Sequence, residues 1–204
     1  MRTFAVISVA ILAFGTTAIY AQEEELRHSE IAVQGVGAFT SGVQGRGLDQ
    51  NATNTGGVLA SYRYLFTQHQ AIEVNYGHDQ FTQQYQTIGF SYRTNIHTDL
   101  DEFTASYVLR FPMKRVVPFV SAGTGAVLFT PSHLLVLNTQ KPNQEALATF
   151  VYGGGVDIKC TNWLVFRLGY RGLVYSAPNM GIPALDVRSI THLAEPAGGF
   201  AITF

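Results

Sequence analysis

The side chains that could do chemistry in this sequence are few and scattered. Ser189, His192 and Glu195 are the types of a nucleophile, a base and an acid, and they lie close together along the chain. Residues three apart on a β-strand point to opposite faces, so His192 and Glu195 cannot meet through a regular strand. Cys160 is the single cysteine, and no base can be assigned to it. We therefore predict no catalytic residues.

Metal and cofactor signals are equally weak. The sequence contains neither the H-E-x-x-H pattern nor a C-x-x-C pair. The glycines of GVGAF and GTGAVL do not complete a dinucleotide-binding pattern, and in strands such glycines serve close packing or bends. Lys and Arg number 13 against 14 Asp and Glu, with no basic run. We predict no cofactor, no metal and no nucleic-acid partner.

The N-terminal segment has the features of an export signal. Arg2 precedes the apolar stretch 4–14, and an acceptable cleavage site ends at Ala21. The stretch is short for a membrane span, which needs about 20 residues. We predict a cleavable signal peptide over 1–21 and a short periplasmic lead-in over 22–28. A single cysteine leaves no internal disulfide in the exported chain.

The elements that must position any site are strands. In EFTASYVLRF at 102–111, aromatic and aliphatic residues on one face alternate with a mostly polar face, as in a half-exposed strand. GVLASYRYLF, AIEVNYGHD and WLVFRLGYRGLVY repeat the alternation. The predicted strands lie at about 29–40, 55–66, 70–81, 100–111, 116–129, 148–160, 163–175 and 191–204.

The connections between these strands alternate in length. Short turns lie near 67–69, 112–115 and 161–162, whereas the other connections are long, over about 41–54, 82–99, 130–147 and 176–190. Most strands exceed the roughly 9–11 residues that cross a bilayer. This asymmetry is typical of outer-membrane barrels. We predict an all-β, antiparallel up-and-down transmembrane β-barrel of about eight strands over 29–204, with a soluble β-barrel as the rival fold.

Four segments fit this pattern poorly. TIGFSYRT at 87–94 is either a strand extension or a separate strand, and HLLVL at 133–137 is either a strand extension or a surface patch. Segment 116–129 has no clean polar face, so its register stays open. Pro196 would delete a ladder hydrogen bond in the last strand.

Aromatic residues near the strand ends predict two girdles at the membrane interfaces. Those at the short-turn ends are Tyr64, Phe66, Phe111, Trp163 and Phe204, and those at the long-loop ends are Phe39, Phe81, Phe129, Phe150 and Tyr175. The alternative is a set of aromatics that fills the core of a β-sandwich.

With these features the chain resembles the small bacterial outer-membrane β-barrels, most of all the OmpA-type barrel domain. YGGGVDIK, FRLGYRGLVY and the terminal GGFAITF carry the resemblance. It implies that Phe200, Ile202 and Phe204 form the C-terminal signal read by the barrel-assembly machinery. We expect no peptidoglycan-binding domain after the barrel, so the anchoring role of full-length OmpA-type proteins is not carried over.

In lipid the polar strand faces must point into the barrel, which at eight strands is just wide enough for its own side chains. The predicted lumen charges are four acids and four bases: Arg63, Glu73, Glu102, Arg110, Asp157, Arg167, Arg171 and Glu195. Buried charges must be paired to be tolerated. We interpret them as a self-neutralising plug, with a narrow pathway for ions or water as the alternative.

The predicted role is structural or surface-interacting, in the cell outer membrane, through extracellular loops and without catalysis. The predicted partners are outer-membrane lipid, the barrel-assembly machinery and any surface ligand that the loops hold. Three alternatives stay open: a narrow channel, a lipid-modifying enzyme, and a soluble lipocalin-like barrel for a small ligand. A lipid A deacylase on the same barrel size uses a Ser/His/acid set, but THLAEP lacks its His-Ser spacing.

Overall fold

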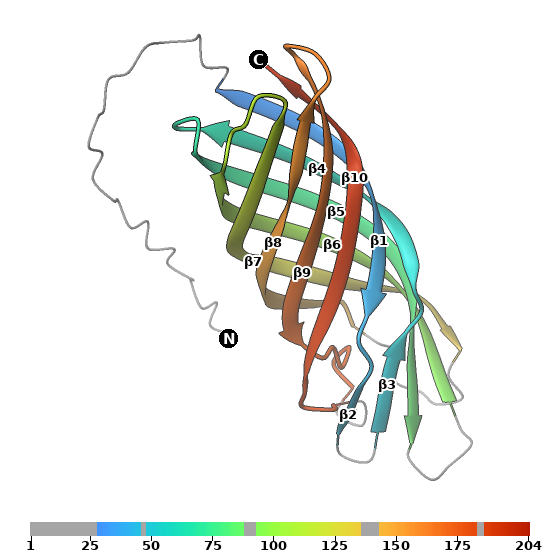
Figure 1. Ribbon diagram of the computed structural model, residues 1–204. Helices are drawn as coiled ribbons and strands as arrows, with labels where there is room; N and C mark the ends of the chain where they lie inside the picture. The colour runs from blue at the N-terminus through green and yellow to red at the C-terminus, as the bar shows by residue number, and fades with distance from the viewer. Residues whose placement is uncertain (1–27, 46–47, 88–92, 136–142, 183–185) are drawn as a thin grey trace, which may run out of the picture.

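The computed structural model describes residues 28–45, 48–87, 93–135, 143–182 and 186–204. These residues form strands joined by turns and loops (Figure 1). The strands are β1 (Ser29–Thr40), β2 (Val43–Gly45), β3 (Leu48–Ala52), β4 (Thr55–Leu65), β5 (Gln70–Thr87), β6 (Arg93–Arg110), β7 (Val116–Leu135), β8 (Glu145–Lys159), β9 (Leu164–Ser176) and β10 (Ile190–Thr203). Within this described part, no helix is long and apolar enough to cross a bilayer.

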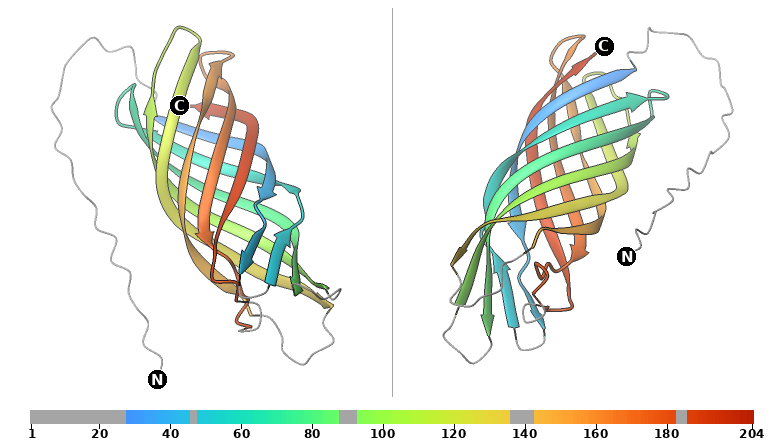
Figure 2. Two further views of the ribbon diagram at one scale, coloured as in Figure 1. Left: turned by 60° about the horizontal axis from the view of Figure 1, so that its bottom comes forward. Right: turned by 180° about the vertical axis from the view of Figure 1, so that it is seen from behind.

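Eight of the strands close into an antiparallel barrel, which confirms the predicted fold class. Sequential pairing runs from β4 to β10, and β1 joins β4 to β10. The seam between the first and last long strands pairs Ile31 with Ile202 and Val33 with Phe200. Beyond the barrel wall, β2 and β3 form a hairpin that continues the sheet along the long-loop end of β5. Figure 2 shows the barrel and this extension from two sides.

The strands on one side of the barrel are longer than predicted. β5, β6 and β7 extend through most of the predicted loop 82–99 and the start of 130–147. Thr87 ends β5 and Arg93 begins β6, so TIGFSYRT contributes to both strands, although 88–92 lie outside the described residues. The extension of β5 is polar and pairs with β3 and β6, so it shows no apolar face by which its sequence could be recognised as a strand.

The predicted loop 41–54 and segment 133–137 also contain strand. The hairpin of β2 and β3 lies in the former. Residues 133–135 of HLLVL belong to β7, whereas 136–137 lie outside the described residues.

The outer surface of the barrel is apolar. Val33, Phe103 and Phe200 are 62%, 56% and 56% exposed, and aliphatic or aromatic residues occupy alternate positions along the neighbouring strands. The opposite strand faces carry buried Gln, Ser, Thr, Asn, Asp, Glu and Arg. This polarity is the one that lipid requires and the reverse of a soluble barrel.

The girdle prediction is wrong for three aromatics at the long-loop end. Phe81, Phe129 and Tyr175 are buried inside the barrel, whereas Phe39 and Phe150 lie on the outer surface. Strand parity explains the difference: Phe81 lies two residues beyond the inward Asp79, so it shares its face.

The sequence left the register of β7 open, and the structure shows that its inward face carries glycines. Val117, Phe119, Val127 and Phe129 are buried, and the inward positions between them include Gly123 and Gly125 rather than polar residues. A Cβ on Gly123 would collide with the carbonyl of Ala105, so the strand wall leaves no room for a side chain there.

Candidate functional site

The interior near the short-turn end holds a ring of six charged residues from six strands. Its arginines are Arg63, Arg110 and Arg167, and its carboxylates are Glu30, Glu73 and Asp157. Arg63 and Arg167 are 1% and 2% exposed, so they are held almost entirely out of bulk water. The formal charges of the six residues sum to zero.

Arg167 is hydrogen-bonded to all three carboxylates of this ring. Its Nε donates to Asp157 Oδ1 at 2.6 Å, and its Nη2 donates to Glu30 Oε2 at 2.7 Å. Its Nη1 donates to Glu73 Oε2 at 3.3 Å. The Phe119 ring lies beneath it, with the guanidinium carbon 5.6 Å from the ring centroid. The planar guanidinium thereby joins carboxylates from three strands across the lumen.

Arg63 mirrors this arrangement from the opposite wall. Its Nε donates to Glu73 Oε2 at 2.7 Å and its Nη1 to Asp157 Oδ2 at 2.9 Å. Its guanidinium carbon lies 4.6 Å from the Phe119 centroid, on the same ring that Arg167 faces. Two arginines on one aromatic ring, joined by shared carboxylates, form a single connected network.

A second charged cluster lies farther along the barrel axis, toward the long loops. Arg171 Nη1 donates to Glu102 Oε1 at 2.7 Å and lies 3.4 Å from Glu195 Oε2. Asp79 is buried on the same inward face of β5 as Gly77, the residue that pairs with Glu102 of β6, so it lies in the same part of the interior. Glu102 and Glu195 therefore share one guanidinium, with Asp79 buried nearby, and neither oxygen of Glu195 has a hydrogen-bond partner among the described residues.

All eight residues predicted to line the lumen are buried, and the structure distributes them between the ring and this second cluster. Sequence reasoning missed Glu30 and Asp79. Glu30 directly follows the acidic lead-in and was not assigned to a strand face, although SEIAVQ already alternates polar and apolar residues from Ser29 onward. With both included, the described interior holds six carboxylates against four arginines.

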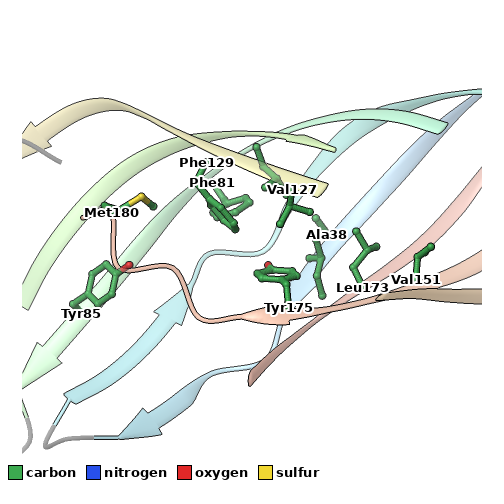
Figure 3. Close-up of a cluster of buried hydrophobic side chains, with 11 residues drawn as sticks. Ala38, Phe81, Tyr85, Val127, Phe129, Val151, Leu173, Tyr175 and Met180 are labelled. Atoms are coloured by element: carbon green, nitrogen blue, oxygen red, sulfur yellow. The ribbon is translucent and has the colours of Figure 1, made fainter. Parts of the chain in front are cut away.

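An apolar layer covers the second cluster on the side of the long loops. Leu100, Leu173 and Leu193 lie two residues from Glu102, Arg171 and Glu195 on the same inward faces. Above them Phe81, Phe129 and Tyr175 pack together, with ring centroids 6.2 Å and 5.6 Å apart (Figure 3). The polar interior and the long-loop mouth are thus separated by a layer of packed hydrocarbon.

The connection between β9 and β10 closes this mouth. Its Met180 is fully buried against the apolar layer and adopts a positive φ of 54°. The backbone N–H groups of Asn179 and Met180 donate to Glu145 Oε2 at 2.9 and 2.7 Å. Tyr85 donates its hydroxyl to the carbonyl of Pro178 at 2.9 Å. Side chains from two opposite walls therefore hold the described part of this connection in the barrel mouth.

The candidate enzymatic residues are not brought together. His192 lies on the outer wall, where its Nε2 is 2.9 Å from the hydroxyl of Tyr152, whereas Glu195 is buried in the interior. Among the described residues, no group of three or more His, Cys, Asp or Glu is arranged to hold a metal ion.

The C-terminal residues that carry the expected assembly signal lie on the outer face. Phe200, Ile202 and Phe204 are exposed, and the backbone N–H of Phe204 donates to the carbonyl of Ser29 at 2.9 Å. The last strand is therefore hydrogen-bonded to the first up to its end, with these apolar side chains directed outward.

Comparison with solved structures gives the fold independently of the residue pattern. Neisserial surface protein A (NspA) superposes with a TM-score of 0.61 at 14% identity, over 86% of this chain and 97% of NspA. The chain has the fold of a small outer-membrane β-barrel. OprG from Pseudomonas aeruginosa gives a TM-score of 0.59 at 12% identity, over 87% of this chain and 96% of OprG.

A third similar structure was solved with a ligand. Ail, the attachment invasion locus protein of Yersinia pestis, in complex with the heparin analogue sucrose octasulfate, gives a TM-score of 0.55 at 15% identity, over 87% of this chain and 98% of Ail. Identities of this size establish a common architecture only. No protein-family model matches the sequence, and a comparison with curated proteins gives no match either.

Proposed function

We propose that this chain is an outer-membrane β-barrel with a structural or surface-interaction role, exercised through its long loops and without catalysis. The observation that carries the proposal is the polarity of the closed barrel, which has an apolar outer wall and an interior of charged and polar side chains. Such a wall is stable only against hydrocarbon. The similarity to NspA, Ail and OprG supports the same location.

The proposal includes the orientation of the barrel in the outer membrane and the signals for its export and insertion. The short turns face the periplasm and the long loops face the outside, as in other outer-membrane barrels. Residues 1–21 act as a cleaved signal peptide, and residues 1–27 lie outside the described part of the chain. The barrel-assembly machinery reads the exposed Phe200, Ile202 and Phe204.

Replacing Phe204 by Ser then lowers the amount of protein in the outer membrane without affecting its synthesis.

The barrel and its location can be tested with one gel. Outer membranes from cells that express the full chain are extracted in detergent and run unheated and boiled. A closed barrel resists SDS until it is boiled, so the unheated band migrates differently. Recovery in the soluble periplasmic fraction without a mobility shift would refute the proposal.

The role of the loops needs a separate experiment. The long loops are candidates for recognition because connecting segments carry most binding residues on rigid scaffolds. Shortening the connections 88–92 and 136–142 leaves the described barrel intact and should lower binding to host cells or envelope components. If the trimmed protein binds equally well, the surface-interaction role is wrong and the structural role stands.

A further inference from the structure

The short-turn end of the barrel opens into a cavity of about 650 Å³. We call this cavity the vestibule, and its charged lining consists of Arg110, Lys114, Arg115 and Lys159 with Glu30 and Asp157. Cys160 also lines it. The volume lies within the roughly 300–1,000 Å³ of small-molecule sites.

The charge of the vestibule is unbalanced. Its carboxylates are already engaged at its inner end, where Glu30 Oε2 accepts from Arg167 at 2.7 Å and Asp157 Oδ1 accepts from the same residue at 2.6 Å. The three outer cations, Lys114, Arg115 and Lys159, belong to none of the ion pairs formed within the described ranges. The vestibule thus presents excess positive charge around a concave surface.

Arg110 links the cations of the rim to the buried ring. It is 7% exposed, and its Nη2 lies 3.1 Å from Glu30 Oε1. Its Nε has no hydrogen-bond partner among the described residues. A buried charged donor without a partner is rare in folded proteins, and here it belongs to a side chain that lines an open cavity.

Backbone contacts hold the rim in place. The N–H of Lys159 donates to the carbonyl of Arg115 at 2.8 Å, which joins the end of β8 to the turn between β6 and β7. The N–H of Met113 donates to the carbonyl of Val116 at 3.0 Å and closes that turn. The backbones of two cationic residues, Arg115 in the turn and Lys159 at the end of β8, are therefore held next to each other by a main-chain hydrogen bond.

We propose that the vestibule binds a multiply charged, phosphate-bearing anion. Guanidinium groups match the oxygens of a phosphate in pairs, and lysine ammonium groups add charge and further donors. The assignment of the site to the periplasmic side rests on the proposed function, whereas the binding itself rests only on the described residues. A wrong assignment to the periplasmic side can therefore be distinguished from a failure of the vestibule to bind the anion.

The first test uses inorganic pyrophosphate as the probe. The full chain, purified in a neutral detergent at low salt, is titrated by calorimetry beside the variant Lys114→Gln/Arg115→Gln/Lys159→Gln. These three side chains are exposed, so the variant should fold as the parent does, which the unheated gel verifies. We expect the variant to bind at least about tenfold more weakly and the parent to lose affinity as salt rises.

A matched control removes one cation at the other end of the barrel. Arg188 is exposed and pairs with Asp186 at 3.1 Å, so Arg188→Gln should leave pyrophosphate binding unchanged. Equal affinity in the parent and the triple variant would overturn the proposal, whereas no binding at millimolar pyrophosphate would exclude a soluble anion and leave a lipid headgroup to the second test.

The single cysteine supplies a second readout that distinguishes the source of the phosphate. Bound anion should slow the reaction of Cys160 with a neutral maleimide in the parent but not in the triple variant. The rate is measured with free pyrophosphate and, separately, in vesicles with and without cardiolipin, whose headgroup carries two phosphates. Protection by pyrophosphate alone identifies a soluble anion, protection by cardiolipin alone identifies a lipid headgroup, protection by both supports a site for either source, and protection by neither refutes the site.

The acidic run Glu23–Glu25 needs its own variant because it precedes β1 by only a few residues. It lies outside the described part of the chain. The variant Glu23→Gln/Glu24→Gln/Glu25→Gln should bind pyrophosphate as tightly as the parent or more tightly. If it binds and the parent does not, the acidic run competes for the vestibule and the external ligand is refuted.

Discussion

The guanidinium of Arg167 is hydrogen-bonded to three carboxylates at once, on residues as far apart in sequence as Glu30 and Asp157. A buried pair contributes little net stability compared with hydrocarbon of the same shape. Removal of one partner is a different matter, because the charge left behind stays buried without compensation. In this ring, loss of one arginine would leave three carboxylates against two guanidinium groups.

We therefore expect Arg167→Met to lower the free energy of unfolding by about 3–5 kcal/mol. The measurement is urea unfolding of the refolded protein in lipid vesicles, monitored at Trp163. Arg188→Met removes an exposed arginine and should change stability by less than about 1 kcal/mol. An Arg167→Met effect as small as that of the control would show that the ring contributes no coupled stability.

Glu195 and Glu102 offer a matched pair around Arg171. Glu102 forms the shorter contact, at 2.7 Å, whereas the oxygens of Glu195 have no hydrogen-bond partner among the described residues. Glu102→Gln should lower the free energy of unfolding by about 1–3 kcal/mol. Glu195→Gln should leave it unchanged or raise it, because it removes charge from a cluster with excess carboxylate. Equal losses in the same unfolding assay would contradict this account.

At the scale of the strand, inward glycines decide how closely the walls approach. Gly199 in β10 faces inward, where a Cβ would collide with the backbone of Val33 and Gln34. Gly35 in the paired β1 faces outward, where the nearest atom to an added Cβ is 4.0 Å away. The two glycines lie in the same seam but have opposite steric surroundings.

This contrast predicts opposite outcomes for one substitution. Gly199→Val should prevent closure of the seam or destabilise it by about 3 kcal/mol, while Gly35→Val should be tolerated. The fraction of SDS-resistant barrel on an unheated gel measures the difference. Because valine favours a strand more than glycine does, loss of the resistant band in both variants would show that the collision at position 199 is not the cause.

Strand alternation was sufficient to predict the barrel but not its full extent. Segments such as 102–111 alternate clearly because lipid and lumen require different side chains on the two faces. In the extension of β5 over 82–87, TQQYQT, polar residues occupy both faces, so this part of the strand had no such alternation. In β7, Gly123 and Gly125 replaced the polar residues that would have indicated its inward face.

The interior was predictable in part for a related reason. The alternation along each strand placed Arg63, Glu73 and Arg167 on the inward faces of their strands. It carries no information on which charges meet across the lumen. Contacts such as that of Arg63 with Asp157, 94 residues apart, depend on barrel closure. The inward placement of Phe81 follows from parity within the predicted strand 70–81, whose inward face also carries Glu73 and Asp79, and the girdle prediction did not apply that parity.

For the whole molecule, the order of layers along the axis bears on the channel alternative. The charged ring, the second charged cluster and the apolar layer follow one another, and Met180 is buried in the mouth. Ions do not cross packed hydrocarbon without a polar path. We expect the protein reconstituted in planar bilayers to give no stepwise conductance, with a known porin as the positive control. Reproducible conductance steps would show that the apolar layer opens.

The unequal strand lengths make one side of the barrel longer than the other. β5, β6 and β7 have 18, 18 and 20 residues, whereas β1 and β4 have 12 and 11, and the tall side is extended further by β3 (Figure 2). A molecule that approaches along the membrane surface therefore meets long strands on one side of the barrel and short strands on the other. Its contacts depend on how the barrel is rotated about the membrane normal, so contacts in a crowded membrane are directional.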